Sequence, residues 1–252
     1  AWSADGEVDN DSFGFIVAGA GDVNGDGFGD IVVSAYVHNN SQGKVYVFHG
    51  SAGGVTGTAA TAPWSTAGEV SDDYFGLAVA GAGDVNGDGY ADVVAGAPYY
   101  NSAQGKMYVF FGGAGGVTGT AASPAWGIGG EAQSNLFGFA LAGAGDVNGD
   151  GYTDVVAGAP FVNSTGKAYV FYGPGGDLSN TPAWTATGQT ANEQFGTSVA
   201  SAGDVNGDGY ADVIVGAPVY NNYQGKVYVF HGSASGVTGT TAAPAWSATG
   251  EV

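Results

Sequence analysis

The nine residues Asp84-Val85-Asn86-Gly87-Asp88-Gly89-Tyr90-Ala91-Asp92 decide the fold, because their pattern, D-x-N-G-D-G-x-x-D, occurs four times. The copies start at Asp22, Asp84, Asp146 and Asp204, so they lie 62, 62 and 58 residues apart. Self-similarity at a nearly fixed period is the signature of a repeat architecture. The sequence therefore predicts a single domain, 1–252, with repeats at approximately 1–62, 63–124, 125–182 and 183–244, plus a spare strand at 245–252.

Each repeat contains four short β-type segments. In the second repeat they cover 75–82, 92–97, 106–110 and 124–128, are rich in Val, Tyr, Phe or small residues, and are bounded by Gly, Asn and Pro. No segment has a helical period. Four strands in about 60 residues match one propeller blade, whereas the coils of a linear β-solenoid are usually shorter. We expect an all-β propeller of four blades, each with four antiparallel strands.

Composition excludes several classes of function. The net charge is −19, from 23 acidic residues against 4 lysines, and such a surface repels nucleic acids and anionic lipids. Cysteine is absent, which excludes disulfides and thiol chemistry. No apolar run is long enough to span a bilayer, so we expect no membrane insertion. The chain starts at Ala1-Trp2-Ser3 without a signal peptide, so we expect a segment of a longer precursor.

The repeated nine-residue pattern has the chemistry of a calcium loop. Side-chain oxygens at positions 1, 3 and 5 can surround a hard cation, glycine at position 6 permits the sharp turn, and a backbone carbonyl at position 7 adds an oxygen. The aspartate at position 9 closes the cage. Ordinary Asx-turns are the alternative, but they leave the clustered carboxylates without a cation. We expect four Ca²⁺ per chain, held by Asp22, Asn24, Asp26, Phe28 and Asp30; Asp84, Asn86, Asp88, Tyr90 and Asp92; Asp146, Asn148, Asp150, Tyr152 and Asp154; and Asp204, Asn206, Asp208, Tyr210 and Asp212.

Two further motifs carry a family resemblance. The Phe-Gly pairs begin at Phe13, Phe75, Phe137 and Phe195, and Gly-Ala-Pro begins at Gly96, Gly158 and Gly216. Over nearly the whole chain this resembles the FG-GAP repeats of integrin α-subunit heads, although the first repeat has Ser34-Ala35-Tyr36 in place of Gly-Ala-Pro. The resemblance implies an extracellular, secreted or cell-surface propeller with calcium sites and a role in adhesion or recognition. Propellers of that family usually have about seven blades.

No catalytic constellation stands apart from the repeats, so we do not expect an enzyme. The leading hypothesis is a calcium-stabilised, non-catalytic recognition module whose loops on one face bind a partner, either a protein or a glycan. A carbohydrate-binding lectin propeller and an accessory domain of a larger secreted hydrolase are the alternatives. The four lysines share one repeat column and are expected to be structural.

Antiparallel strands place successive loops at alternate ends of a blade. The calcium loops join first to second strands, so the second-to-third loops lie on the opposite face and form the candidate ligand face. Packing of its rings between blades is the alternative role. Its candidate residues are Tyr36, His38, Tyr99, Tyr100, Phe161, Tyr220 and Tyr223.

Closure of the ring has three solutions. A Trp-containing fourth strand occurs five times, at Trp2, Trp64, Trp126, Trp184 and Trp246, whereas each other strand occurs four times. The chain could close as four blades with one copy loose, form an eight-bladed ring as a homodimer, or belong to a longer array. Bulky rings between blades favour association into a larger ring.

Overall fold

The computed structural model describes residues 2–173 and 178–251. In this part of the chain the strands form four sheets, each of four antiparallel strands in sequence order, as the repeats predict. The first sheet contains β1 (Val17–Gly21), β2 (Asp30–Ala35), β3 (Lys44–Phe48) and β4 (Trp64–Ala67). The second contains β5 (Ala78–Gly83), β6 (Asp92–Ala97), β7 (Lys106–Phe110) and β8 (Trp126–Gly129). The third contains β9 (Ala140–Gly145), β10 (Asp154–Ala159), β11 (Lys167–Phe171) and β12 (Trp184–Thr187). The fourth contains β13 (Ser198–Gly203), β14 (Asp212–Ala217), β15 (Lys226–Phe230) and β16 (Trp246–Thr249).

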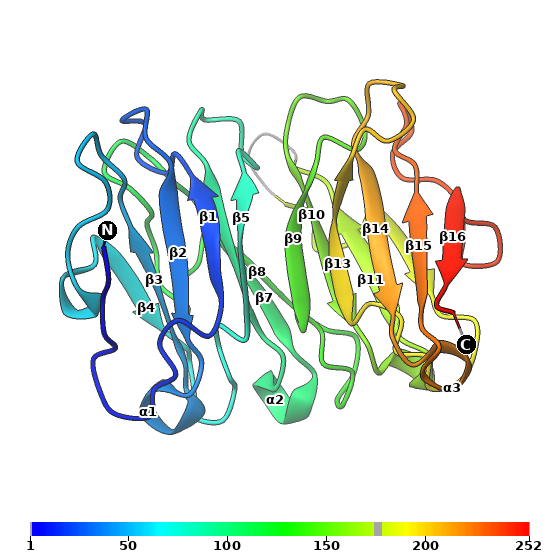
Figure 1. The fold of residues 1–252 in the computed structure, drawn as a ribbon, viewed down its shortest axis with the longest axis horizontal. Helices are drawn as coiled ribbons and strands as arrows, with labels where there is room; N and C mark the ends of the chain where they lie inside the picture. The colour runs from blue at the N-terminus through cyan, green and yellow to red at the C-terminus, as the bar shows by residue number, and fades with distance from the viewer. Residues whose placement is uncertain (1, 174–177, 252) are drawn as a thin grey trace.

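The four sheets are propeller blades that stand side by side. Their first strands, β1, β5, β9 and β13, pack against one another in series. Figure 1 shows the first blade at one end of this row and the fourth blade at the other, with the two termini at opposite ends. Each blade therefore contacts the next through a face of its sheet, and each end of the row presents one outward face.

Short helical turns follow the second strands of all four blades. They are α1 (His38–Ser41), α2 (Tyr100–Ala103), η2 (Val162–Ser164) and α3 (Tyr220–Tyr223), and another turn, η1 (Ala59–Thr61), precedes β4. In α2 the residues Asn101, Ser102 and Ala103 have φ of 50°, 61° and 62°, which is left-handed backbone. Asparagine tolerates this conformation better than most residues. In Figure 1 α1, α2 and α3 lie along the lower edge of the row.

Aromatic rings fill the space between blades. Phe137 is 2% exposed and meets Tyr169 edge-on, with ring centroids 5.2 Å apart. Trp64 of β4 reaches across to the second blade, where its ring centroid lies 5.0 Å from that of Phe110 on β7. Tilted and edge-to-face contacts of this kind add to the burial of the rings. The fourth strand of each of the first three blades thus contributes its Trp to the interface with the next blade.

Two of the expected strand ranges are wrong at their ends. The first strand of the second repeat begins at Ala78 instead of residue 75, because Tyr74 and Gly76 have φ of 54° and 87° and interrupt the extended chain. The fourth strand covers Trp126–Gly129 instead of 124–128. The expected ranges 92–97 and 106–110 are confirmed as β6 and β7.

The two terminal copies of the Trp segment have different places. Residues 245–252, the spare strand of the repeat boundaries, supply β16, which pairs with β15 from Trp246 to Thr249. The N-terminal copy, residues 2–6, belongs to no strand. Trp2 nevertheless packs on Phe48 with ring centroids 5.1 Å apart. The N-terminal copy therefore covers the first blade without completing a sheet.

Candidate metal loops and recognition face

The first aspartate of each nine-residue loop organises the turn. Asp22 Oδ1 accepts the Gly25 N–H at 2.7 Å, and its Oδ2 accepts the Gly27 N–H at 2.8 Å. The Gly27 amide, together with those of Gly25 and Asp26, lowers the pKa of Asp22 below its ordinary value. The other three loops repeat these bonds. Each loop is therefore closed on the carboxylate of its first aspartate.

Positions 3 and 5 lie beside each other in the same turn. Asn24 Oδ1 accepts the Asp26 N–H at 3.0 Å, while its Nδ2 donates to Asp26 Oδ2 at 2.9 Å. Asp26 Oδ1 accepts the Phe28 N–H at 2.9 Å. The same bonds recur in the other three loops. Three predicted ligand side chains of each loop are thus gathered within one turn.

The aspartate at position 9 of each loop accepts hydrogen bonds from amides outside those bound by positions 1, 3 and 5. Asp30 is 2% exposed, its Oδ2 accepts the Val23 N–H at 2.8 Å, and its Oδ1 accepts the Gly50 N–H at 2.7 Å. This carboxylate therefore ties the loop to the end of β3. Asp92, Asp154 and Asp212 make the equivalent pairs of bonds. Burial raises the pKa of Asp92 to about 6 and that of Asp154 to about 7.

Position 7 connects neighbouring loops. A Cβ on Gly25 would clash with the ring of Tyr90, and Gly87 and Gly149 meet Tyr152 and Tyr210 in the same way. Each ring therefore covers the loop of the preceding blade. The backbone adds to this contact, because the Ala91 N–H donates to the Asp22 carbonyl at 3.0 Å. The sequence did not indicate that the candidate metal loops also join the blades.

The donor set fits a hard cation, because carboxylate, amide and carbonyl oxygens are the ligands that Ca²⁺ takes. In the described part of the chain, however, no three acidic or histidine side chains are grouped so as to hold a metal ion where they now lie. The oxygens of Asp22, Asn24 and Asp26 bond to loop amides, and those of Asp30 to two more. The ligand set stays a prediction.

The candidate ligand face divides into exposed and packed rings. Tyr99 and Phe161 are each 42% exposed, and Tyr223 is 80% exposed. Tyr100 and Tyr220 are half-buried, and each lies under a lysine ammonium 5.0 Å from the ring centroid. Each of these two rings thus packs against a lysine of its own blade, and their place in the ligand face stays a prediction.

A row of rings crosses the first two blades on the candidate ligand face. Tyr36 lies between Phe15 and Tyr74, with ring centroids 4.3 Å and 5.9 Å away, and Tyr74 continues the row to Tyr99 at 4.9 Å. His38 turns inward instead, with Nδ1 3.8 Å from Asp11 Oδ2. The row is thus open to solvent at both ends, because Phe15 is 51% and Tyr99 42% exposed.

The lysine column has partners that the sequence analysis missed. Lys44 Nζ donates to Glu7 at 2.8 Å, and Lys106 and Lys167 pair with Glu69 and Glu131. Each glutamate stands 36 or 37 residues before its lysine, a spacing that would have indicated the pairs. Glu69 follows β4, so its ion pair joins the first blade to the second. In the fourth repeat Gln189 replaces the glutamate, and Lys226 Nζ lies 3.5 Å from its Oε1.

No helix in residues 2–173 or 178–251 has the length and apolar character needed to cross a membrane.

Comparison with known proteins supports the repeat assignment. A model of the FG-GAP repeat matches residues 13–48, 75–118, 137–171 and 195–230, which is more than half of the chain. Integrin alpha-5 of Xenopus laevis is 33% identical over 176 residues, 66% of this chain and 16% of the relative. Integrin alpha pat-2 of Caenorhabditis briggsae is 35% identical over 195 residues, which cover 67% of this chain and 15% of the relative. Integrin alpha-3 of Cricetulus griseus is 36% identical over 152 residues, which cover 57% of this chain and 14% of the relative. The chain thus spans about a sixth of these relatives at most, and it belongs to the FG-GAP repeat family.

Proposed function

We propose that this chain is an extracellular, non-catalytic recognition module that Ca²⁺ stabilises and that binds a protein partner in adhesion. The observation that carries the proposal is the fourfold loop, which places oxygen ligands of three side chains in one turn and also joins adjacent blades. The similarity to integrin α subunits supports the recognition role.

Calcium would act on the blade interfaces as well as on the loops. Each loop of the first three blades accepts an amide of the next blade, as Asp84 O does from the Thr153 N–H at 2.9 Å. An ion that fixes the loop therefore also fixes the neighbouring blade. At ten times the dissociation constant one site adds about 1.4 kcal/mol, and four independent sites together add about 6 kcal/mol.

The calcium proposal predicts a stoichiometry and a thermal shift. Calorimetric titration of the metal-free chain should give four ions, and saturating Ca²⁺ should raise the melting temperature by on the order of 10–20 °C. The variant Asp84→Asn should bind one ion fewer. Asp72→Asn, which removes an exposed acid outside the loops, should still bind four. An unchanged melt in excess chelator would show that calcium does not stabilise this chain.

The exposed rings of the candidate ligand face support the recognition role. Tyr99, Phe161 and Tyr223 present apolar surface to solvent from three different blades, and aromatic residues are enriched at protein interfaces. Replacing all three by alanine should abolish partner binding and leave the melting temperature within a few degrees, because the rings are partly solvated. Loss of folding in this variant would favour the packing role.

A second candidate is carbohydrate binding, and one hollow favours it. A hollow of about 320 Å³ lies on the fourth blade between Thr190, Asn192, Tyr220, Asn221 and Tyr223. It combines aromatic rings with amide and hydroxyl groups, which suits stacking and hydrogen bonding to a sugar. A glycan array with the Tyr223→Ala variant as control tests this candidate. The absence of any glycan signal would exclude carbohydrate binding and leave a protein as the candidate partner.

A further inference from the structure

The three blade interfaces share one plug and one socket. The plug is the Phe-Gly pair of the following blade, and the socket is a glycine-lined hollow in the preceding blade. At the second interface the Phe137 N–H donates to the Gln104 carbonyl at 3.2 Å, and a Cβ on Gly105 would clash with the Phe137 carbonyl. Phe195 fits against Gly166 in the same way, and Phe75 against Gly43. Glycine is required at this position because the backbone of the following blade occupies the space that a Cβ would need.

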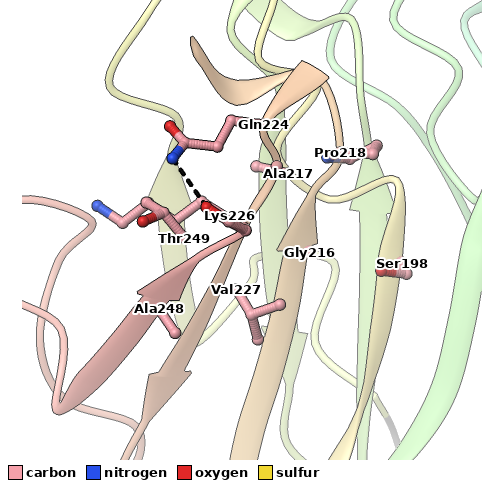
Figure 2. A pocket seen from close by; sticks show the side chains of 11 residues that line it. Ser198, Gly216, Ala217, Pro218, Gln224, Lys226, Val227, Ala248 and Thr249 are labelled. Carbon is pink, nitrogen blue, oxygen red and sulfur yellow. Dashed lines mark hydrogen bonds between the residues drawn. The ribbon is translucent and has the colours of Figure 1, made fainter. Parts of the chain in front are cut away.

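The fourth socket is open. It is a hollow of about 430 Å³ on the fourth blade. Figure 2 shows the side chains that line it, among them Gln224, whose Nε2 donates to the Gly250 carbonyl at 2.8 Å. Gly216 and Gly225 line it. Gly225 is the repeat equivalent of Gly43, Gly105 and Gly166, and Gly216 is the equivalent of Gly96 and Gly158. Among the described residues, a Cβ on Gly216 or Gly225 would meet only atoms of the same blade.

Side-chain exposure distinguishes this face from the equivalent faces of the first three blades. Val227 on β15 is 36% exposed, whereas its repeat equivalents Val45, Met107 and Ala168 are 0% exposed. Trp246 is 55% exposed, whereas Trp64 in the first blade is 9% exposed. The fourth blade thus presents to solvent apolar side chains whose equivalents in the first three blades are buried or half-buried.

The free plug lies at the other end of the row. Among the described residues no other blade lies against Phe13-Gly14 of the first blade, and a hollow of about 570 Å³ lies beside it against Val17 and Ile31. Val17 is 67% exposed, whereas its equivalents Val79 and Leu141 are 6% and 8% exposed. The 252 residues therefore carry both halves of a fourth interface, on two faces at opposite ends of the row.

We propose that a second copy of this chain docks head to tail, with its Phe13-Gly14 plug in the socket formed by Gly216, Gly225 and Gly250. The proposal continues an interface that the molecule already builds three times, and it does not depend on calcium or on the proposed partner. Two such contacts related by a twofold axis close a ring of eight blades. The net charge of −19 per chain opposes association at low ionic strength, so salt should favour the dimer.

The N-terminal segment competes for the same contact. Trp2 Nε1 donates to the Gly57 carbonyl at 3.0 Å, just as Trp64 Nε1 donates to the Gly119 carbonyl at 3.1 Å. Trp2 therefore occupies the position on the first blade that Trp246 of a docked copy would take. Residues 2–6 lie in no sheet, whereas β16 is paired over four residues, so the N-terminal segment is the one to be displaced.

Sedimentation velocity of the 252-residue chain over a wide concentration range tests the proposal. In physiological salt the mass should rise from 24.8 kDa to twice that value. Val17→Asp and Val227→Asp each place a charge on one exposed face and should weaken association at least tenfold, because an unpaired charge is costly to bury. Val70→Asp, at a 53% exposed valine away from both faces, is the matched control and should associate like the parent.

Mixing the two variants distinguishes a head-to-tail contact from a face-to-face one. Val17→Asp keeps an intact socket and Val227→Asp an intact plug, so an equimolar mixture should form a 1:1 dimer through one interface. Trp2→Ala should strengthen association and Trp246→Ala weaken it. Circular dichroism melts check that each variant is folded. A parent chain that stays monomeric at high concentration, or a mixture that fails to associate while the parent does, would overturn the proposal.

Discussion

Replacing Asp73 by asparagine is expected to stabilise the chain near neutral pH. Asp73 lies between the first and second blades, is 5% exposed, and its Oδ2 has no hydrogen-bond partner among the described residues. Burial is the main cause that raises its pKa from 3.8 to about 6; the Glu69 carboxylate adds to the increase, and the Val70 amide opposes it. An ionised Asp73 therefore costs folding free energy.

The sign and size of the effect follow from the two pKa values. In the unfolded chain Asp73 loses its proton near pH 3.8, and in the folded chain near pH 6. Between these values the folded state binds more protons, so the free energy of unfolding falls as pH rises, and the loss is complete above about pH 6. About two pH units correspond to about 3 kcal/mol. Asp73→Asn cannot ionise, so it should gain up to about 3 kcal/mol at pH 7 and less than about 1 kcal/mol at pH 4.

The same substitution in the first repeat should have the opposite effect and is the control. Asp11 occupies the same column, but its Oδ1 accepts the Phe13 N–H at 3.0 Å and its Oδ2 accepts the Glu7 N–H at 3.2 Å. Asp11→Asn loses one acceptor and should cost about 1 kcal/mol. The third repeat has Asn135 in this column, so the amide fits the fold. Urea unfolding followed by tryptophan fluorescence from pH 4 to 7.5 measures the free energy of unfolding of the two variants and of the parent. A pH-independent difference between Asp73→Asn and the parent would refute the reasoning.

The remaining predictions concern the interface between the second and third blades. Phe137→Ala should lower the free energy of unfolding by about 3–5 kcal/mol, because it removes a ring that is 2% exposed, whereas Phe13→Ala, at the half-buried equivalent, should cost less than half as much. Gly105→Ala should cost clearly more than Gly54→Ala: both glycines have positive φ, 84° and 89°, but only Gly105 would also clash with backbone. The left-handed conformation alone costs roughly 1–2 kcal/mol. Equal losses in either pair, measured by urea unfolding, would contradict the role of the plug and socket.

The repeat made most of the blade predictable. The ranges of β6 and β7 follow from runs of Val, Tyr and Phe bounded by turn residues, and such local signals are sufficient for strands buried on both sides. The start of β5 was not predictable in this way. Tyr74 has φ of 54° because the link it belongs to is fixed by the preceding blade, whose Ser41 carbonyl accepts its N–H at 2.8 Å. Tertiary contacts of this kind leave no local sequence signal.

The sequence predicted the candidate metal loops in more detail than the candidate ligand face. The loop pattern indicated which residues share a turn, and the hydrogen bonds of Asp22, Asn24 and Asp26 place these side chains together. The second role of Asp30, which accepts the Gly50 N–H, depends on a residue 20 positions away and was not visible in the loop itself. On the opposite face, the pattern could not separate Tyr99 from Tyr100. The two are adjacent in sequence, yet the first is solvent-exposed and the second lies under Lys106.

The curvature of the row is determined by a gradient of side-chain size across each blade. The first strands consist mainly of Ala and Gly, and a Cβ on Gly81 of β5 would crowd the backbone of Gly19 and Ala20 in β1. Toward the fourth strands the same interface holds the rings of Trp64 and Phe110. Blades that approach closely at one edge and are held apart at the other form wedges, and the wedge angle fixes how many blades complete a turn. That number is therefore a property of the interface residues, whichever chain supplies the next blade. A larger residue in place of Gly81 would widen the inner edge, flatten the row and move the plug of a second copy out of reach of its socket.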